Sequence, residues 1–155
     1  MRRILVLLTV FVLCVVSGAA AQTVLVTGTT SRLDGGRYVP LGKIQIVVTR
    51  GNAVVTSGTS DPANGSFTLN VPVGPPFTIA FYGEQRVPEL QQLAGAQLTK
   101  DNVNVTLLTP AEYTREFGGR LPLAQKLECD RRLLPEEAKD ARAYMQQMIN
   151  QQPGR

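Results

Sequence analysis

The side chains that most often carry enzymatic chemistry are scarce in this sequence. Its 155 residues contain no histidine and two cysteines, Cys14 and Cys129. Histidine is the usual general base at neutral pH and a common metal ligand, zinc sites are built mainly from cysteine and histidine, and a Ser-His-Asp or Cys-His arrangement needs the imidazole. The composition therefore predicts no catalytic residue, no metal site and no cofactor.

Two groups of carboxylates remain as candidates. Asp61, close to Asn64, offers the oxygen ligands that calcium prefers, but no further pair of carboxylates lies near it in the sequence, and we expect an Asx turn instead. Glu136 and Glu137 resemble a paired acid. We expect them to lie in the first turn of a helix that begins at Pro135, where acidic residues complement the helix dipole.

Cys129 and the tyrosines offer two further possibilities. Cys129 is either a reactive thiol or a partly buried residue between leucines, and we expect the second. Tyr38, Phe81 and Tyr82 are candidates for stacking on sugars. Because neighbouring residues of a strand point to opposite faces, at most one of Phe81 and Tyr82 lies outside. The triplets that begin at Asn64 and Asn104 match glycosylation acceptors, which matter only in a host that glycosylates.

The N-terminus has the pattern of a secretory signal peptide. Arg2 and Arg3 precede an apolar run over residues 4–16, and small residues follow, with Ala19 and Ala21 placed for cleavage before Gln22. The run is shorter than the roughly 20 residues of a membrane span, so a retained anchor is the less favoured alternative. We discount a lipoprotein at Cys14, which lacks small residues just before it. The pattern predicts a secreted or periplasmic protein without membrane insertion after leader removal.

Charge and cysteine content limit the partners. The net charge is +4 for the whole chain and falls by two when Arg2 and Arg3 leave with the leader. Lysine and arginine are scattered and are not interleaved with aromatic residues, so we expect no nucleic acid partner. After cleavage only Cys129 remains, so no internal disulfide can form, and stability must come from a buried core.

The middle of the chain has the alternation of short β-strands. Apolar and polar residues alternate in several segments that are separated by Gly, Pro, Asn and Asp, which is typical of an antiparallel sandwich or barrel. We predict strands over 23–29, 43–49, 53–57, 66–71, 77–81 and 103–107, with a seventh near 38–41 and one or two helical turns over 88–94.

After Thr109 the pattern becomes helical. Thr109-Pro110-Ala111-Glu112 is a capping box with proline at the first helical position, Gly118 and Gly119 end that helix, and a second is predicted over 122–134. The helix from Pro135 has an apolar face. This face packs either on its own domain or on a protein partner; the candidate partner-binding residues are Tyr144, Met145 and Met148.

Several of these segments resemble one known family. Val26-Thr27-Gly28-Thr29, the run 39–46, Thr59-Ser60-Asp61 and the run "GSFTLNVPVG" at 65–74 are similar to the carboxypeptidase regulatory-like domain, a transthyretin-like (prealbumin-like) β-sandwich. Here Ser60 separates Thr59 from Asp61, and 62–64 lengthens the turn. The resemblance covers about residues 23–108. It implies an accessory domain whose shared positions are turn and core residues, without catalytic ones.

The sequence therefore predicts a mainly β protein in three parts. These are a signal peptide (1–21), an antiparallel Greek-key β-sandwich of about seven strands (22–108) and a helical C-terminal extension (109–155). The expected function is a non-catalytic exported accessory domain that provides a binding or scaffolding surface in the bacterial envelope or outside the cell. The alternatives are a carbohydrate-binding module and an envelope adaptor that recruits an enzyme or transporter through its C-terminal helix. The adaptor alternative predicts that a chain ending at Thr109 still folds. Ligand, partner and oligomeric state are not specified.

Overall fold

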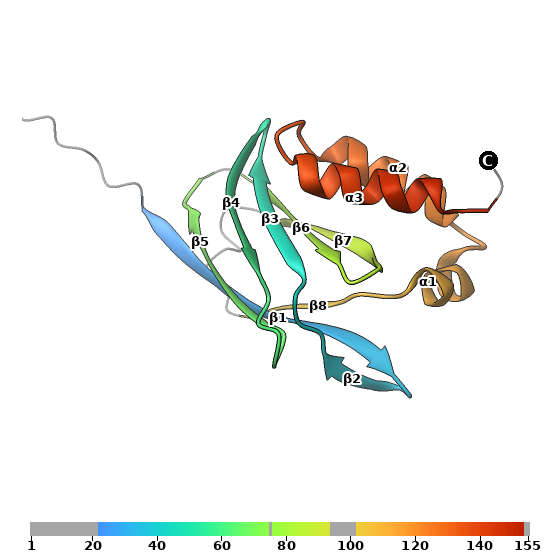
Figure 1. The fold of residues 1–155 in the computed structure, drawn as a ribbon. Coiled ribbons are helices and arrows are strands. Elements are labelled where there is room, and N and C mark those ends of the chain that lie inside the picture. The colour runs from blue at the N-terminus through green and yellow to red at the C-terminus, as the bar shows by residue number, and fades with distance from the viewer. Residues whose placement is uncertain (1–21, 75, 94–101, 154–155) are drawn as a thin grey trace, which may run out of the picture.

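The computed structural model describes residues 22–74, 76–93 and 102–153. It contains eight strands in two antiparallel sheets, followed by three helices (Figure 1). The predicted mainly β fold with a helical C-terminal part is thereby confirmed, with eight strands in place of about seven. The predicted leader and the predicted cleavage residues Ala19 and Ala21 lie outside the described residues, whereas Gln22 is described and exposed.

The first sheet is built around the long strand β1 and has the order β2-β1-β5, with β8 also paired to β1. The pairing of β8 with β1 is parallel, whereas the other pairs are antiparallel. Its strands are β1 (Thr23–Asp34), β2 (Arg37–Pro40), β5 (Ser66–Pro72) and β8 (Val103–Thr106). The second sheet has the order β4-β3-β6-β7, from β3 (Gln45–Arg50), β4 (Ala53–Thr59), β6 (Phe77–Gly83) and β7 (Arg86–Leu93).

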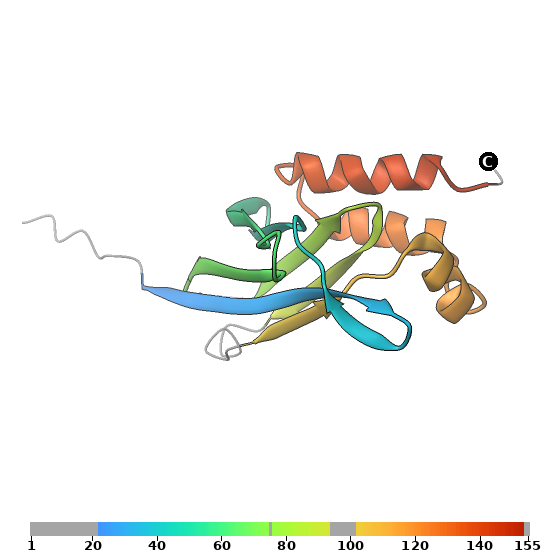
Figure 2. The same cartoon turned by 60° about the horizontal axis from the view of Figure 1, so that its bottom comes forward.

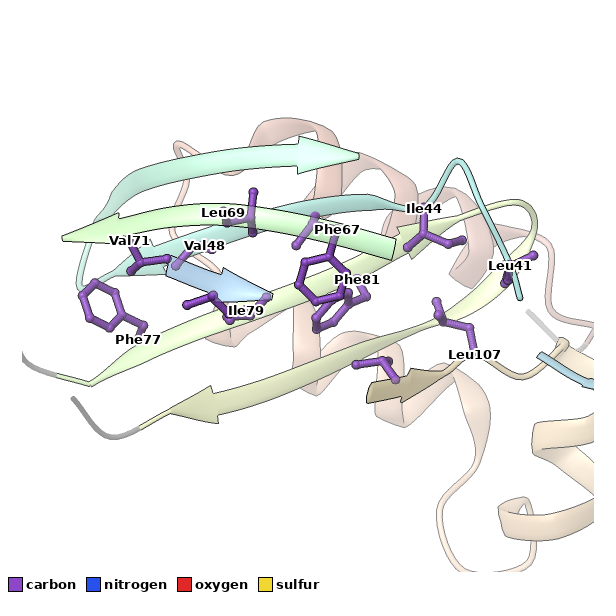
Figure 3. Close-up of a cluster of buried hydrophobic side chains, with 13 residues drawn as sticks. Leu41, Ile44, Val48, Phe67, Leu69, Val71, Phe77, Ile79, Phe81 and Leu107 are labelled. Carbon is purple, nitrogen blue, oxygen red and sulfur yellow. The ribbon is translucent and has the colours of Figure 1, made fainter. Parts of the chain in front are cut away.

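The main hydrophobic core lies between the two sheets (Figure 3). The alternating side chains of β5 point into it as the sequence predicts: Phe67, Leu69 and Val71 are each at most 5% exposed. Phe67 meets Phe81 of β6 with ring centroids 5.5 Å apart. Burial of such side chains contributes about 1.5–3 kcal/mol each, so this layer supplies much of the stability.

The turn before β5 is an Asx turn, as predicted. Asp61 Oδ1 accepts hydrogen bonds from the backbone N–H groups of Ala63, at 2.7 Å, and Asn64, at 3.2 Å, while Asn64 Oδ1 accepts one from Ser66. Gly65 has a φ of +68°, which favours glycine. The carboxylate therefore organises the backbone. Among the described residues no cluster of three or more His, Cys, Asp and Glu side chains is placed to hold a metal ion.

Three helices follow: α1 (Pro110–Phe117), α2 (Leu123–Leu133) and α3 (Lys139–Asn150). The capping box at Thr109 forms, because its hydroxyl accepts from the Glu112 N–H and the Glu112 carboxylate accepts from the Thr109 N–H. Figure 2 shows α2 and α3 on one side of the molecule and β1 and β8 on the other. The helices bury a second cluster against the outer face of the second sheet, which supplies Val47, Ala80 and Val87.

Two predicted helical segments differ from the structure. Residues 88–93 belong to strand β7, where Leu93 pairs with Phe77 and Glu89 with Phe81 of β6, and Ala94 lies outside the described residues. Pro88 is tolerated because β7 is an edge strand. The third helix begins at Lys139, four residues after Pro135.

The residues predicted to start that helix serve other contacts. Glu137 accepts a hydrogen bond from the Val54 N–H of β4 at 3.0 Å, and Glu136 lies 2.7 Å from Arg142. The expectation that both acids lie in a first helical turn is therefore wrong. They lie in the connection between α2 and α3 and bind it to β4 and to α3. Cys129, expected to be partly buried, is exposed on α2.

No helix in the described residues combines the length and apolar character needed to cross a membrane.

Candidate functional site

The three predicted partner-binding residues on α3 pack against the chain's own second sheet. Met145 is 0% exposed and Met148 4%. The Tyr144 hydroxyl donates to the carbonyls of Gly83 and Arg86, at 3.0 and 2.8 Å, and its ring lies 5.6 Å from that of Tyr82. Of the two alternatives for this apolar face, the structure shows packing on its own domain. The contacts of these three residues are thus made within the domain.

The three aromatic candidates for sugar stacking are separated in the structure. Phe81 is fully buried between the sheets, and Tyr82 is partly covered by Tyr144 of α3. Tyr38 is 75% exposed, the highest value among the large hydrophobic side chains that the structure leaves at the surface. The expectation that at most one of Phe81 and Tyr82 lies outside is confirmed, and Tyr38 is the exposed member of the three.

Tyr38 lies on strand β2 of the β1–β2 hairpin, where its side chain is exposed. It pairs with Leu33 across the two strands. The turn between them uses Gly35 and Gly36, with φ of +56° and +78°, values that other residues adopt only with strain. Two grooves meet at Tyr38 and share Thr106. The hairpin thus places one aromatic side chain between two surfaces of different character.

The first of these, the apolar groove, has a volume of about 500 Å³ and lies between the hairpin, β7 and the first two helices. Such a volume is typical of ligand-binding clefts. Its apolar lining includes two exposed side chains, Phe117 at 43% and Leu121 at 36%. The other described lining residues are the apolar or aromatic Leu33, Tyr38, Val87, Leu108 and Tyr113, together with Thr106 and the charged Glu89, Glu116, Arg120 and Lys126. Exposed apolar groups that gather at one hollow are typical of an interaction site.

A group of charged residues lies at one side of the apolar groove. Lys126 of α2 donates from Nζ to Asp130 and to the Pro88 carbonyl, the latter at 2.9 Å, and lies 3.9 Å from Glu89. Burial raises the pKa of the Glu89 carboxyl, an effect that nearby Lys126 opposes and Asp130 reinforces. The ammonium group is thus shared among several oxygens, and Glu89 is the least closely paired of them.

Helix α1, which supplies Phe117, is held by contacts of two neighbouring residues in its first half. At its start Glu112 lies 3.5 Å from Arg86 of β7. Further along, the Tyr113 hydroxyl donates to the Leu121 carbonyl at 3.1 Å, and burial raises the pKa of this phenol. The first contact links α1 to β7 of the second sheet, and the second links α1 to the turn that supplies Leu121.

Replacing Glu112 by glutamine tests the anchor of α1. The backbone hydrogen bond from Thr109 is the main cause that lowers the pKa of Glu112 below its ordinary value of 4.5, with Arg86 adding to it. The charged form is thus stabilised by folding, and this contribution is present above pH 4.5 and lost as the pH falls through the lower folded-state pKa. We expect Glu112→Gln to cost about 1 kcal/mol at pH 7, because a neutral acceptor is weaker.

Urea unfolding at neutral and strongly acidic pH measures this effect. The stability difference between Glu112→Gln and the parent should shrink as the pH falls below the folded-state pKa. Glu116→Gln is the matched control, because this glutamate of the same helix has no hydrogen bond or ion pair to the described residues. A pH-independent difference, or equal losses in both variants, would contradict the assignment.

The second surface, the polar groove, has a volume of about 570 Å³ and lies on the other side of Tyr38. Hydroxyl and amide side chains line it. Thr29 donates to Asn104 Oδ1 at 2.7 Å, and the hydroxyls of Ser31 and Thr106 are 3.0 Å apart. Both contacts join β1 to the parallel strand β8.

The described linings of the two grooves contain neither histidine nor cysteine. The chain contains no histidine, and Cys129 does not line either groove. The arrangement is suited to binding through apolar contact on one side and hydrogen bonding on the other. Sequence reasoning selected Tyr38 but missed Phe117, Leu121 and Glu89, which come together only through the packing of α1 on β7. Phe117 could have been noticed in the sequence as an apolar residue directly before Gly118-Gly119, where the helix was predicted to end.

The class of protein that the fold defines is a two-sheet antiparallel β structure with C-terminal helices. No protein-family model matches the chain, and no curated protein matches it significantly.

Proposed function

We propose that this chain is an exported, non-catalytic accessory β-sandwich that binds a partner protein in the apolar groove. The similarity of the turn and strand at residues 59–74 to the carboxypeptidase regulatory-like domain supports an accessory role. The sequence of residues 1–22 supports export to the periplasm or the outside of the cell. The observation that carries the proposal is the apolar groove itself, where Tyr38, Phe117 and Leu121 are exposed together.

The occupant we propose is a segment of another protein that has apolar side chains and one basic side chain. The apolar residues would cover Phe117 and Leu121, and the basic group would lie against Glu89. Lys126 is already hydrogen-bonded to Asp130 and the Pro88 carbonyl. A second cation near Glu89 would therefore offset the cost of partly burying the Glu89 carboxylate. Removal of apolar area from water would supply most of the affinity.

The adaptor hypothesis takes a new form in this proposal. The C-terminal helix α3 is used to cover the second sheet, so recruitment through its Met145 and Met148 face would require the helix to leave that sheet. Helix α1 and the turn after it supply Phe117 and Leu121 instead. The helical extension would then act in two ways, with α2 and α3 stabilising the fold and α1 forming the recognition wall.

Selection from a displayed peptide library tests this proposal. Peptides enriched on the chain that starts at Gln22 should combine apolar residues with lysine or arginine. Phe117→Ser should weaken their binding, measured by fluorescence polarisation, by at least about tenfold, equivalent to about 1.4 kcal/mol. Leu133→Ser is the matched control, because Leu133 is a 55% exposed apolar residue on α2 that does not line the groove.

Glu89→Gln provides the second arm of the experiment. It should weaken the basic peptides and leave variants of them with a neutral residue in place of the basic one unchanged, because only the charge contact is lost. Enriched peptides without basic residues, or binding that Phe117→Ser leaves intact, would contradict the proposal.

A further inference from the structure

The outer face of the first sheet carries a surface that the apolar groove does not explain. Figure 2 shows helices α2 and α3 on the opposite side of the molecule, and helix α1 lies near this face at its Leu33–Tyr38 end, where the apolar groove is. In a sandwich, one face of each sheet is buried in the core and the other is available to solvent or a ligand. The question is which ligand the chemistry of the available face matches.

Strand register shows which residues share this face. Paired residues lie side by side on the same face, and every second residue along a strand belongs to it. Thr29 pairs with Asn104 and Ser31 with Thr106 on β8, while Tyr38 pairs with Leu33 on β1. On β5, the outward partners of β1 are Ser66, Thr68 and Asn70.

The outward positions of the described strands in this sheet carry no charged residue. The charged side chains of β1 and β2, which are Arg32, Asp34 and Arg37, occupy the alternate positions. The lack of charge at these outward positions is informative because the whole chain has 16 basic and 12 acidic residues. Apart from Leu25 and Leu33 on β1, this face is rich in threonine, serine and asparagine and carries an exposed tyrosine, so it is an uncharged, hydrogen-bonding surface.

The polar groove is the hollow part of this face. The described residues that line it are uncharged; besides Tyr38 they include Thr29, Ser31, Pro40, Asn64, Asn104 and Thr106. Their contacts leave ligand-binding capacity. Asn104 uses Oδ1 to accept from Thr29, and Asn64 uses Oδ1 to accept from the Ser66 N–H, and neither amide nitrogen donates to another described residue.

These features match the chemistry of a neutral sugar chain. Sugar hydroxyls both donate and accept hydrogen bonds, as do the hydroxyl and amide groups here. The C–H groups on a sugar ring pack against an aromatic face, and Tyr38 offers a ring that is 75% exposed at the rim of the groove. An ionised ligand would enter a hollow without a counter-charge in its described lining, which makes its desolvation costly.

We propose that the polar groove binds a neutral polysaccharide, with Tyr38 stacking on a sugar ring and Asn64 and Asn104 donating hydrogen bonds to its hydroxyls. The polar groove adjoins the apolar groove at Tyr38 and Thr106, but binding of a sugar chain there does not require a protein partner in the apolar groove. A module with both sites would hold a partner protein on a glycan surface.

Affinity electrophoresis of the chain that starts at Gln22 tests this proposal. The gels contain a neutral polysaccharide (amylopectin, xyloglucan, mixed-linkage β-glucan or dextran) or the anionic polymer alginate. We expect retardation in at least one neutral gel and none in alginate. Tyr38→Ala and Asn104→Asp should each weaken the retardation by at least about tenfold, the second by placing a charge in the groove with little change in shape.

Three controls separate the possible outcomes. Asn52→Asp adds the same charge in the exposed turn between β3 and β4 and should leave retardation unchanged. Phe117→Ser tests the apolar groove and should also leave it unchanged, so failure of the two proposals can be told apart. Thermal midpoints within a few degrees of the parent show that the variants fold, and Tyr38→Ala, at an exposed position, keeps the test valid if Asn104→Asp does not.

The proposal is overturned by absence of retardation in all four neutral gels. It is also overturned by retardation in alginate alone, or by Tyr38→Ala migrating like the parent chain in the gel that retards the parent.

Discussion

A chain that ends at Thr109 is expected to lose the cooperative unfolding transition of the full chain. Helices α2 and α3 cover Val47, Ala80 and Val87, which are at most 6% exposed on the outer face of the second sheet. Exposure of the two valines alone costs up to about 1.5–3 kcal/mol each. Domains of this size are stable by only about 5–15 kcal/mol, and the loss of helix side chains from the same cluster adds to the cost.

Differential scanning calorimetry measures this effect. The chain from Gln22 to Thr109 should show no sharp transition and should bind a dye that reports exposed apolar surface. A chain that ends at Gln152 keeps α3 and its last hydrogen bonds and should unfold like the full chain. A cooperative transition in the shorter chain, within a few degrees of the parent midpoint, would show that the sandwich is independent of its helices, as the adaptor alternative predicts from the sequence.

Gly65→Ala is expected to have the second largest effect. Gly65 has a φ of +68°, and a Cβ placed there would lie 2.3 Å from the Thr30 carbonyl oxygen. The backbone around it is tightly linked, because the Gly65 carbonyl accepts from the Thr30 N–H at 2.8 Å and the Leu41 N–H donates to the Thr30 carbonyl at 2.9 Å. Left-handed strain of about 1–2 kcal/mol and overpacking of about 1–3 kcal/mol together predict a loss near 3 kcal/mol.

Gly35→Ala separates these two causes. Gly35 has a similar φ of +56°, but a Cβ there meets no atom within 4 Å. It should therefore lose only the strain contribution, about 1–2 kcal/mol. Urea unfolding of both variants gives the comparison. Equal losses would mean that the close approach to Thr30 relaxes without cost and that the turn is less constrained than the structure indicates.

The sandwich was predictable where local patterns and tertiary packing agree. Strand β5 has apolar residues at alternate positions after a turn of Asp, Pro, Asn and Gly, and each of these features is found in the structure. The capping box at Thr109 forms for the same reason, since its hydrogen bonds are local. Such segments specify their conformation within a few residues.

Predictions failed where contacts distant in the sequence decide the outcome. Residues 88–93 have a proline and leucines at helical spacing, yet pairing with β6 makes them a strand. Glu136 and Glu137 suit a helix start, but their contacts to Arg142 and Val54 place them before the helix. The apolar groove was missed for the same reason, because Phe117 and Glu89 come to line one groove only when α1 packs on β7.

The parallel pairing of β1 with β8 has a consequence for the order of folding. Thr29 and Asn104, which touch in the finished fold, are 75 residues apart in the chain. Contacts between such distant residues form slowly because a large loop must close first. A nascent chain therefore carries one edge of β1 without its β8 partner until most of the protein has been synthesised, and an arrest before that point would leave this edge open to aberrant pairing with other chains.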